Sequence, residues 1–335
     1  MITRDDAPAA PRGGYEPLSG TVVPRFAGLA TFMRLPYVDP QALPADLDIG
    51  LVGIPFDSAT TNRPGTRHGP RQVREMSTLM RPVNFVTGIA PHDLCNCADL
   101  GDAPVNPVDV RDTLERIESF YAALRARRIT PLSIGGDHLV TYPILRALSG
   151  GEPLGMIHVD AHSDVGDTYF NGARLTHGTP FRRAIEDGVL DPRRTVQIGL
   201  RGTAYSLDER DWALEQGIRI IDMEEVMDLG IDAAVVEARR VVGEGRTYLT
   251  YDIDSLDPTY APGTGTPEVG GLTSREALRL VRGFRKLDLV GADVVEVSPP
   301  LDPTGGTALI GASIAFELLC LLAETHAARH GARRR

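Results

Sequence analysis

The feature that most constrains this chain is an apolar strand at residues 154–159 that runs directly into Asp160-Ala161-His162-Ser163-Asp164. Side chains two residues apart in an extended segment lie on the same side of the backbone, so the two aspartates and the histidine can converge on one point. Burying such groups is costly unless a partner offsets their charge, and a divalent cation is the simplest partner. The stretch therefore indicates a metal site at the end of a strand, with an ordinary polar turn as the alternative.

Strands and helices alternate along most of the chain. Buried apolar runs predict strands at 48–55, 129–134, 154–159, 195–200, 218–222, 247–252 and 290–296. The remaining periodic segments predict helices at 71–80, 111–128, 139–148, 180–187, 207–215, 231–242, 274–286 and 307–325. Such alternation is typical of an α/β fold, with a parallel sheet of seven or eight strands and helices on both of its faces.

The same pattern predicts how the chain is divided. No linker interrupts the series, so we expect a single domain over 21–325. Residues 1–20 are rich in Ala, Pro, Gly and charge and predict a flexible N-terminal arm, while 326–335 predict a frayed, basic C-terminal tail. The segment 258–272, rich in Gly and Pro, predicts a functional loop.

Composition limits the partners and the compartment. A formal net charge of −10 argues against nucleic-acid or membrane-surface binding, both of which favour a basic face. The three cysteines are too few and too scattered for a disulfide framework, and no signal peptide is visible. The longest apolar run, 308–323, contains Glu317 and is shorter than a membrane span, which favours a buried helix. We therefore expect a cytoplasmic protein with no nucleic-acid or membrane partner.

Two further strand ends carry metal-type side chains. Strand 129–134 ends in Gly135-Gly136-Asp137-His138, where the glycines allow a turn that points His138 into the crevice, although a lone histidine there is more often structural. Strand 247–252 ends with Asp252 and Asp254 on one side of the backbone. Six ligands suit a two-metal site with bridging carboxylates. Oxygen and imidazole without thiolate favour Mn²⁺ over Zn²⁺ or Mg²⁺, and are also compatible with Ni²⁺ or Co²⁺.

Charge counting narrows the substrate class. Two divalent ions balance the four aspartates among these ligands, so a hydroxide and Glu296, near the end of strand 290–296, make the site net negative. Such a pocket favours a cationic electrophile, whereas a phosphate requires surplus positive charge. The loop after the first strand carries Arg63, Arg67 and His68, which predict contacts to an anionic group or, equally, a bracing role.

Three segments together resemble the signature blocks of the ureohydrolase superfamily of arginase, agmatinase and related amidinohydrolases: Gly135-Gly-Asp-His138, Asp160-Ala-His-Ser-Asp164 and Asp252-Ile-Asp-Ser-Leu-Asp-Pro258. The resemblance covers about residues 24–325. It is closest to the agmatinase-like branch that includes guanidinobutyrase and guanidinopropionase, through the segments 24–36, 100–107, 177–183 and 296–300. Ser255 departs from the glycine of many relatives. The resemblance implies a three-layer α/β/α sandwich and a homo-oligomer, either a trimer or a hexamer.

The resemblance also implies residue roles. It places His138, Asp160, Asp164 and Asp252 around one manganese ion and His162, Asp160, Asp252 and Asp254 around the other, with Asp160 and Asp252 bridging. A hydroxide between the ions attacks the guanidinium carbon and hydrogen-bonds to Asp164. Glu296 pairs with the substrate guanidinium, and His177 carries a proton to the departing amine. The implied products are urea and a primary amine.

Substrate length depends on the loop 165–176, which lies between the metal ligands and His177. Tyr169, its bulkiest side chain, predicts a short pocket for 3-guanidinopropionate, whose carboxylate we expect Arg174 or the loop 63–68, which contains Arg63, to bind. The alternatives are guanidinobutyrase or agmatinase activity, a metal-dependent deacetylase or phosphatase, and a non-catalytic subunit that keeps the fold for assembly.

Overall fold

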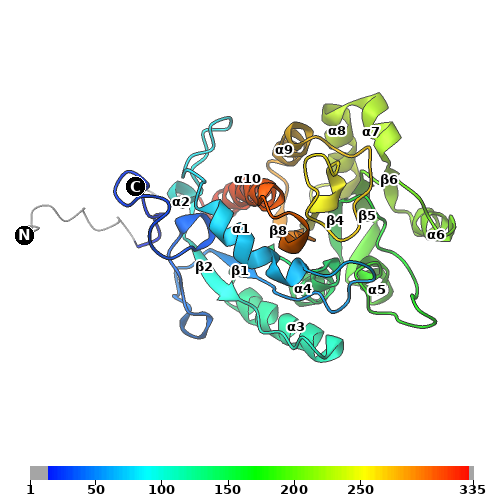
Figure 1. Ribbon diagram of the computed structural model, residues 1–335, viewed down its shortest axis with the longest axis horizontal. Helices are drawn as coiled ribbons and strands as arrows, with labels where there is room; N and C mark the ends of the chain where they lie inside the picture. The colour runs from blue at the N-terminus through cyan, green and yellow to red at the C-terminus, as the bar shows by residue number, and fades with distance from the viewer. Residues whose placement is uncertain (1–13, 332–335) are drawn as a thin grey trace, which may run out of the picture.

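A single parallel sheet organises the chain. The computed structural model describes residues 14–331, and all eight of its strands lie in the order β2-β1-β3-β8-β7-β4-β5-β6 (Figure 1). The strands are β1 (Ile49–Gly53), β2 (Cys97–Asp102), β3 (Thr130–Ile134), β4 (Leu154–Val159), β5 (Leu190–Ile198), β6 (Arg219–Ile221), β7 (Thr247–Asp252) and β8 (Leu289–Val295). Every neighbouring pair is parallel, as near-continuous apolar runs predict.

Helices cover both faces of the sheet and complete a three-layer α/β/α sandwich. They are α1 (Gly69–Ser77), α2 (Pro91–Leu94), α3 (Val110–Ala126), α4 (Thr141–Ser149), α5 (Pro180–Glu186), α6 (Asp208–Gln216), α7 (Met223–Leu229), α8 (Ile231–Val242), α9 (Ser274–Gly283) and α10 (Gly306–His330). One buried apolar cluster takes residues from α1, α8, α9 and α10, and a second takes residues from α3, α4 and α5. The predicted α/β/α architecture is confirmed.

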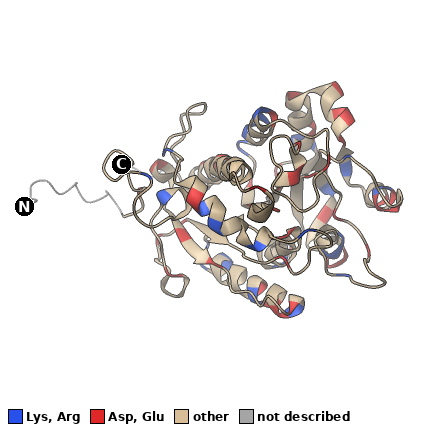
Figure 2. Cartoon of the chain, viewed as in Figure 1, with Lys and Arg blue, Asp and Glu red and all other residues tan. Residues whose placement is uncertain are grey.

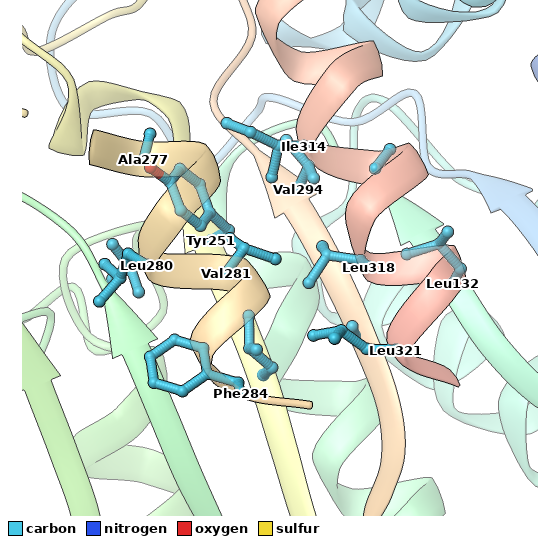
Figure 3. Packing of buried hydrophobic residues seen from close by; sticks show 14 of the residues in the cluster. Leu132, Tyr251, Ala277, Leu280, Val281, Phe284, Val294, Ile314, Leu318 and Leu321 are labelled. Carbon is cyan, nitrogen blue, oxygen red and sulfur yellow. The ribbon is translucent and has the colours of Figure 1, made fainter. Parts of the chain in front are cut away.

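Helix α9 shows how local sequence builds one of these layers. Its first turn is held by a capping box between Thr273 and Glu276. Ala277, Leu280 and Val281, at three- and four-residue spacing, form the buried face of the helix. Figure 3 shows this face beside α10 and strands β7 and β8. The packing anchors the strands whose ends carry the candidate site.

Helix α10 is the longest helix of the described chain. Among residues 14–331 it alone is long and apolar enough, by length and composition, to cross a membrane. Most of its side chains are nevertheless buried, and it packs against β8, α1 and α9. The prediction of a buried helix over the apolar run is therefore confirmed.

The structure corrects several predicted boundaries. Strand β2 was not predicted, because Asp99 and Gly101 interrupt its apolar run; Arg74 pairs with the buried Asp99. The predicted tail at 326–335 is wrong up to His330, because α10 continues to that residue and Arg329 hydrogen-bonds to Asp288 at 2.7 Å. Residues 332–335 lie outside the described chain.

The predicted N-terminal arm also lies largely outside the described residues, which begin at Gly14. Within the described part, the main-chain N–H of Leu18 donates to the carbonyl of Arg34 at 2.9 Å, and Tyr15 donates to Asp46 at 2.9 Å. Residues 14–20 are thus tied to the domain. Acidic and basic residues are interspersed along the chain, for example along α3 (Figure 2).

Candidate metal centre

Four adjacent strands at the middle of the sheet deliver the candidate site. In the order β3-β8-β7-β4 they are neighbours, although they come from distant parts of the sequence. His138 follows β3, Glu296 follows β8, Asp252 ends β7, and Asp160 follows β4. Parallel strands place their carboxyl ends at one edge, and such an edge is where open α/β sheets bind ligands. The sequence-predicted ligands therefore meet in one crevice.

The first half of the centre surrounds His138. Its Nδ1 atom lies 3.1 Å from Asp160 Oδ2, 3.0 Å from Asp164 Oδ2 and 3.2 Å from Asp252 Oδ2. This nitrogen is buried and makes no hydrogen bond of acceptable geometry. A buried polar atom without a partner, facing three carboxylates, fits a position that a cation would occupy.

The second half surrounds His162. Its Nδ1 atom lies 3.1 Å from Asp254 Oδ2 and 3.4 Å from Asp160 Oδ1. The two oxygens of Asp160 face the two histidines separately, but Oδ1 also accepts a hydrogen bond from the main-chain N–H of His162 at 2.7 Å. Oδ1 of Asp252 likewise accepts one from the main-chain N–H of Asp254 at 2.8 Å. A bridging role for Asp160 and Asp252 stays a prediction.

The pKa shifts of the cluster residues indicate an excess of negative charge in the cluster. Burial alone would lower the pKa of His138, but the nearby carboxylates of Asp160, Asp164 and Asp252 raise it well above its ordinary value. Burial likewise opposes protonation of His162, and Asp254 and Asp160 raise its pKa. Burial and the neighbouring carboxylates Asp254 and Asp160 raise the pKa of Asp252. The cluster thus has the composition and the charge demand of a divalent-metal site.

Two of the predicted site residues have strained backbones. Asp164 has φ 50° and Glu296 has φ 63°, in the left-handed region that side chains other than glycine rarely adopt. Such strain costs on the order of 1–3 kcal/mol and persists where the surrounding structure holds it. Here it aims two carboxylates toward the same crevice.

Glu296 and His177 form the part of the site beside the cluster. Oε1 of Glu296 accepts hydrogen bonds from the main-chain N–H of His138 and from Nδ1 of His177, both at 2.9 Å. Its second oxygen, Oε2, is buried and has no partner within the described residues. The carboxylate therefore keeps one free acceptor, which a cationic ligand can use.

Burial and the charge of Glu296 shift the pKa of His177 in opposite directions. Burial would lower its pKa, but the charge of Glu296 raises it to about 9. The main-chain N–H of Thr61, however, points at Nε2 from 3.1 Å, which requires an unprotonated nitrogen. This contact indicates a neutral ring with its proton on Nδ1. Bound metal cations in the neighbouring cluster would favour that state.

An open cavity of about 870 Å³ leads to this cluster. Tyr169 and Arg63, both predicted from the sequence, line it. Arg174 does not, and this prediction is wrong for a plain reason: its side chain is 55% exposed and pairs with Glu186 at 2.8 Å, outside the cavity. Arg67 pairs with Asp57, so it braces its loop.

Sequence reasoning missed several cavity residues. Glu209 and Arg210 at the start of α6 line the cavity, and so does Tyr205 in the preceding loop. Their segment has the sequence of an ordinary polar helix start, so nothing in it indicated a functional site. Arg201 also lines it and donates to the carbonyls of Asp254 and Glu268 at 2.8 and 2.6 Å, so it clamps the loops around the site.

His158 is a further residue that the sequence did not single out. Its Nε2 lies 2.6 Å from Asp160 Oδ2, and its Nδ1 faces the side-chain amide of Gln197 at 3.1 Å. An amide N–H at Nδ1 leaves the ring proton on Nε2, which donates to Asp160. His158 therefore orients a predicted ligand.

Together the fold and the site define an α/β protein with a candidate divalent-metal centre at the carboxyl edge of its sheet. A family comparison then identifies it further: the model described as the Arginase family matches residues 47–321, and the chain belongs to that family. This confirms the resemblance predicted from the sequence.

Individual relatives agree. A guanidinopropionase of Pseudomonas aeruginosa is 62% identical over 313 residues, which cover 93% of this chain and 97% of that protein. A guanidinobutyrase of the same organism is 47% identical over 309 residues, covering 92% and 97% respectively. Among solved structures, the proclavaminate amidino hydrolase from Streptomyces clavuligerus superposes with a TM-score of 0.85 at 41% identity, covering 90% of this chain and 99% of its own.

Proposed function

We propose that this protein is a ureohydrolase that splits a linear guanidino acid, 3-guanidinopropionate, into urea and β-alanine. The observation that carries the proposal is the free oxygen of Glu296, a buried carboxylate acceptor that lies beside the His/Asp cluster and has no partner among residues 14–331. The choice of substrate class rests on the similarity to guanidinopropionase over nearly the whole length of both chains.

The chain's own residues would perform most of the reaction. A guanidinium stays protonated at neutral pH and reacts very slowly with water. Bound divalent ions lower the pKa of water and so supply a nucleophile near neutrality. Oε2 of Glu296 binds the guanidinium, and Asp164 accepts a hydrogen bond from the attacking water. Nδ1 of His177 holds the proton that the departing amine needs, 2.9 Å from Glu296.

We assign two Mn²⁺ ions per subunit to this centre. His138, Asp160, Asp164 and Asp252 would hold one ion, and His162, Asp160, Asp252 and Asp254 the other. Carboxylate oxygens and imidazoles without thiolate suit Mn²⁺, and Ni²⁺ or Co²⁺ can use the same ligands. The orphaned Nδ1 of His138 supports this assignment.

Two arginine side chains in the cavity favour a substrate that is anionic at the end opposite its guanidinium. Nε and Nη2 of Arg63 donate to the carbonyls of Gly265 and Thr264 at 2.9 and 3.0 Å, which leaves Nη1 for a ligand. Arg210 lines the cavity, and no hydrogen bond or ion pair joins its side chain to any residue within 14–331. It is the cation best placed to bind the carboxylate, and it replaces Arg174 in that role. Glu209, Asp222 and Glu268 also line the cavity, so discrimination against agmatine, whose far end is cationic, depends on the local contact with Arg210.

Urea release tests the proposal directly. Purified protein loaded with Mn²⁺ is assayed with 3-guanidinopropionate, 4-guanidinobutyrate, agmatine and arginine. We expect the highest kcat/KM for 3-guanidinopropionate, by about tenfold or more over its longer homologue, because one methylene changes binding by about 1–3 kcal/mol. A preference for agmatine contradicts the substrate. If no urea forms from any of the four, the activity itself is contradicted, and a deacetylase, a phosphatase or a non-catalytic subunit remains.

We also propose a cytoplasmic homo-oligomer, either a trimer or a hexamer. Phe26, Leu29 and Phe85 are 95%, 87% and 101% exposed, and a hydrogen bond of 2.8 Å from Arg25 to the carbonyl of Leu79 joins their two segments. Large apolar side chains this exposed are common at protein interfaces. Light scattering after gel filtration tests this, and a monomer for the wild type would contradict it; Phe85→Asp should lower the mass. Cell fractionation tests the location.

A further inference from the structure

Asp293 is a fully buried carboxylate that none of the roles above uses. It lies on β8, three residues before Glu296, and is 0% exposed. Three hydroxyl groups surround it. Oδ1 accepts a hydrogen bond from Thr250 at 2.6 Å, and Oδ2 accepts from Thr141 at 2.7 Å and from Tyr248 at 2.9 Å. Burying a carboxylate is costly, and three donated hydrogen bonds offset that cost.

Thr250 connects this carboxylate to the metal cluster. Its Oγ1 lies 2.8 Å from Nε2 of His138, on the far side of the ring from Nδ1. A hydroxyl group has one proton, and here that proton is directed to Asp293. The oxygen can therefore only accept from His138, so Nε2 must carry the ring proton. Nδ1 is then the nitrogen that faces Asp160, Asp164 and Asp252.

We propose that Asp293 is a positioning residue that acts through Thr250 to fix the tautomer and orientation of His138 and so sets the affinity of one of the two metal sites. The inference rests on the metal centre of the proposed function. A metal-binding histidine generally donates its other N–H to such a partner, and loss of the partner typically weakens metal binding by about 10–100-fold.

His162 provides an internal comparison. Its side chain is 31% exposed, and no hydrogen bond joins its Nε2 to a residue of the described chain. The two histidines are therefore held unequally. Losing the contact to Asp293 should weaken the ion bound by His138 and leave the ion bound by His162 unchanged.

Titration of metal-stripped protein with Mn²⁺ tests this without any activity measurement. Isothermal calorimetry or electron paramagnetic resonance of free Mn²⁺ gives the two dissociation constants. For Asp293→Asn and Thr250→Val we expect one constant to rise about 10–100-fold and the other to stay at the wild-type value. Thr250→Ser keeps the hydroxyl and should restore wild-type binding, which a role in packing alone would not predict.

Ser133→Ala is the matched control. Ser133 pairs in register with Asp293 from the neighbouring strand, and its buried hydroxyl bonds to Tyr121 at 2.7 Å and also to Tyr248, so it reaches Asp293 through Tyr248 and not through Thr250. We expect both constants to stay unchanged in this variant. If Asp293→Asn fails to fold, the comparison of Thr250→Val with Thr250→Ser still decides. The inference is overturned if folded Thr250→Val binds both ions as tightly as the wild type, whereas wild-type protein that binds no Mn²⁺ would overturn the metal centre itself.

Discussion

His177 and Glu296, 119 residues apart in the chain, share a hydrogen bond of 2.9 Å between Nδ1 and Oε1 beside the metal cluster. In the proposed function, this pairing couples Glu296, which we propose binds the guanidinium, to His177, which we propose moves the proton. His177 is not one of the proposed metal ligands. A mutation of His177 can therefore separate catalysis by the site from metal binding by the site.

Replacing His177 tests its role as proton carrier. We expect His177→Asn to lower kcat for urea release by about 10²–10⁴-fold, the usual contribution of a positioned general acid or base. The metal content should remain at the wild-type level. Steady-state kinetics with metal analysis of the same samples checks both, and a parallel loss of metal would show that the residue acts on the structure of the centre instead.

Tyr169 should set the substrate length. Its ring packs against the loop that carries His177, since a Cβ atom added to Gly178 would lie 2.7 Å from the tyrosine hydroxyl. Tyr169→Ala opens space in the cavity, so we expect kcat/KM for 4-guanidinobutyrate relative to 3-guanidinopropionate to rise about tenfold. Phe170→Ala is the control, because that ring is 74% exposed and should leave the ratio unchanged. An unchanged ratio in both variants would remove Tyr169 from substrate selection.

Arg210 should bind the substrate carboxylate. Loss of a charged hydrogen bond typically costs about 1.5–3 kcal/mol, so we expect Arg210→Gln to raise KM for 3-guanidinopropionate by about tenfold or more. Any slow turnover of agmatine should not fall. Arg174→Gln removes an arginine that is paired outside the cavity and should leave KM unchanged. Equal effects of the two substitutions would indicate a general charge effect and contradict a specific contact.

Asp257 should hold the loop 258–272 against the site in a pH-dependent way. Hydrogen bonds from Thr259, and then from the amides of Gly270 and Gly271, lower the pKa of Asp257 to about 2. Because an unfolded aspartate has a pKa of about 3.9, this stabilisation is complete above that pH and is lost as the pH falls toward 2.

Asp257→Asn should therefore reduce the free energy of unfolding at pH 7 by no more than about 1 kcal/mol, since solvent screens the exposed carboxylate. The difference in Tm between the variant and the wild type should shrink below about pH 4. Thermal unfolding of both proteins across pH 3–7 checks this. A difference that stays constant with pH would mean that the charge of Asp257 plays no part.

The sequence predicted the centre of the molecule better than its periphery. Asp160, His162 and Asp164 were recognised from their residue types and spacing at the end of an apolar strand. Their convergence does not come from extended backbone alone, because β4 ends at Val159 and Asp164 has φ 50°. Strand β2 was missed because its buried Asp99 is satisfied by Arg74, a contact that no local pattern reveals. Arg174 was misplaced for the same kind of reason, because a loop's sequence does not show which way its side chains point. The tertiary fold sets the place of Arg210 in the cavity and the three hydroxyl partners of Asp293, and no local pattern shows either.

The strand order has a consequence for synthesis in the cell. β3 and β8 are neighbours in the sheet, yet the main-chain N–H of His138 and the carboxylate of Glu296 that accepts it are 158 residues apart. A nascent chain on the ribosome cannot complete this contact until nearly nine-tenths of the 335 residues have been translated and β8 has emerged. The Glu296 carboxylate thus joins the crevice only at the end of folding, and translation products that stop before β8 cannot form the complete site.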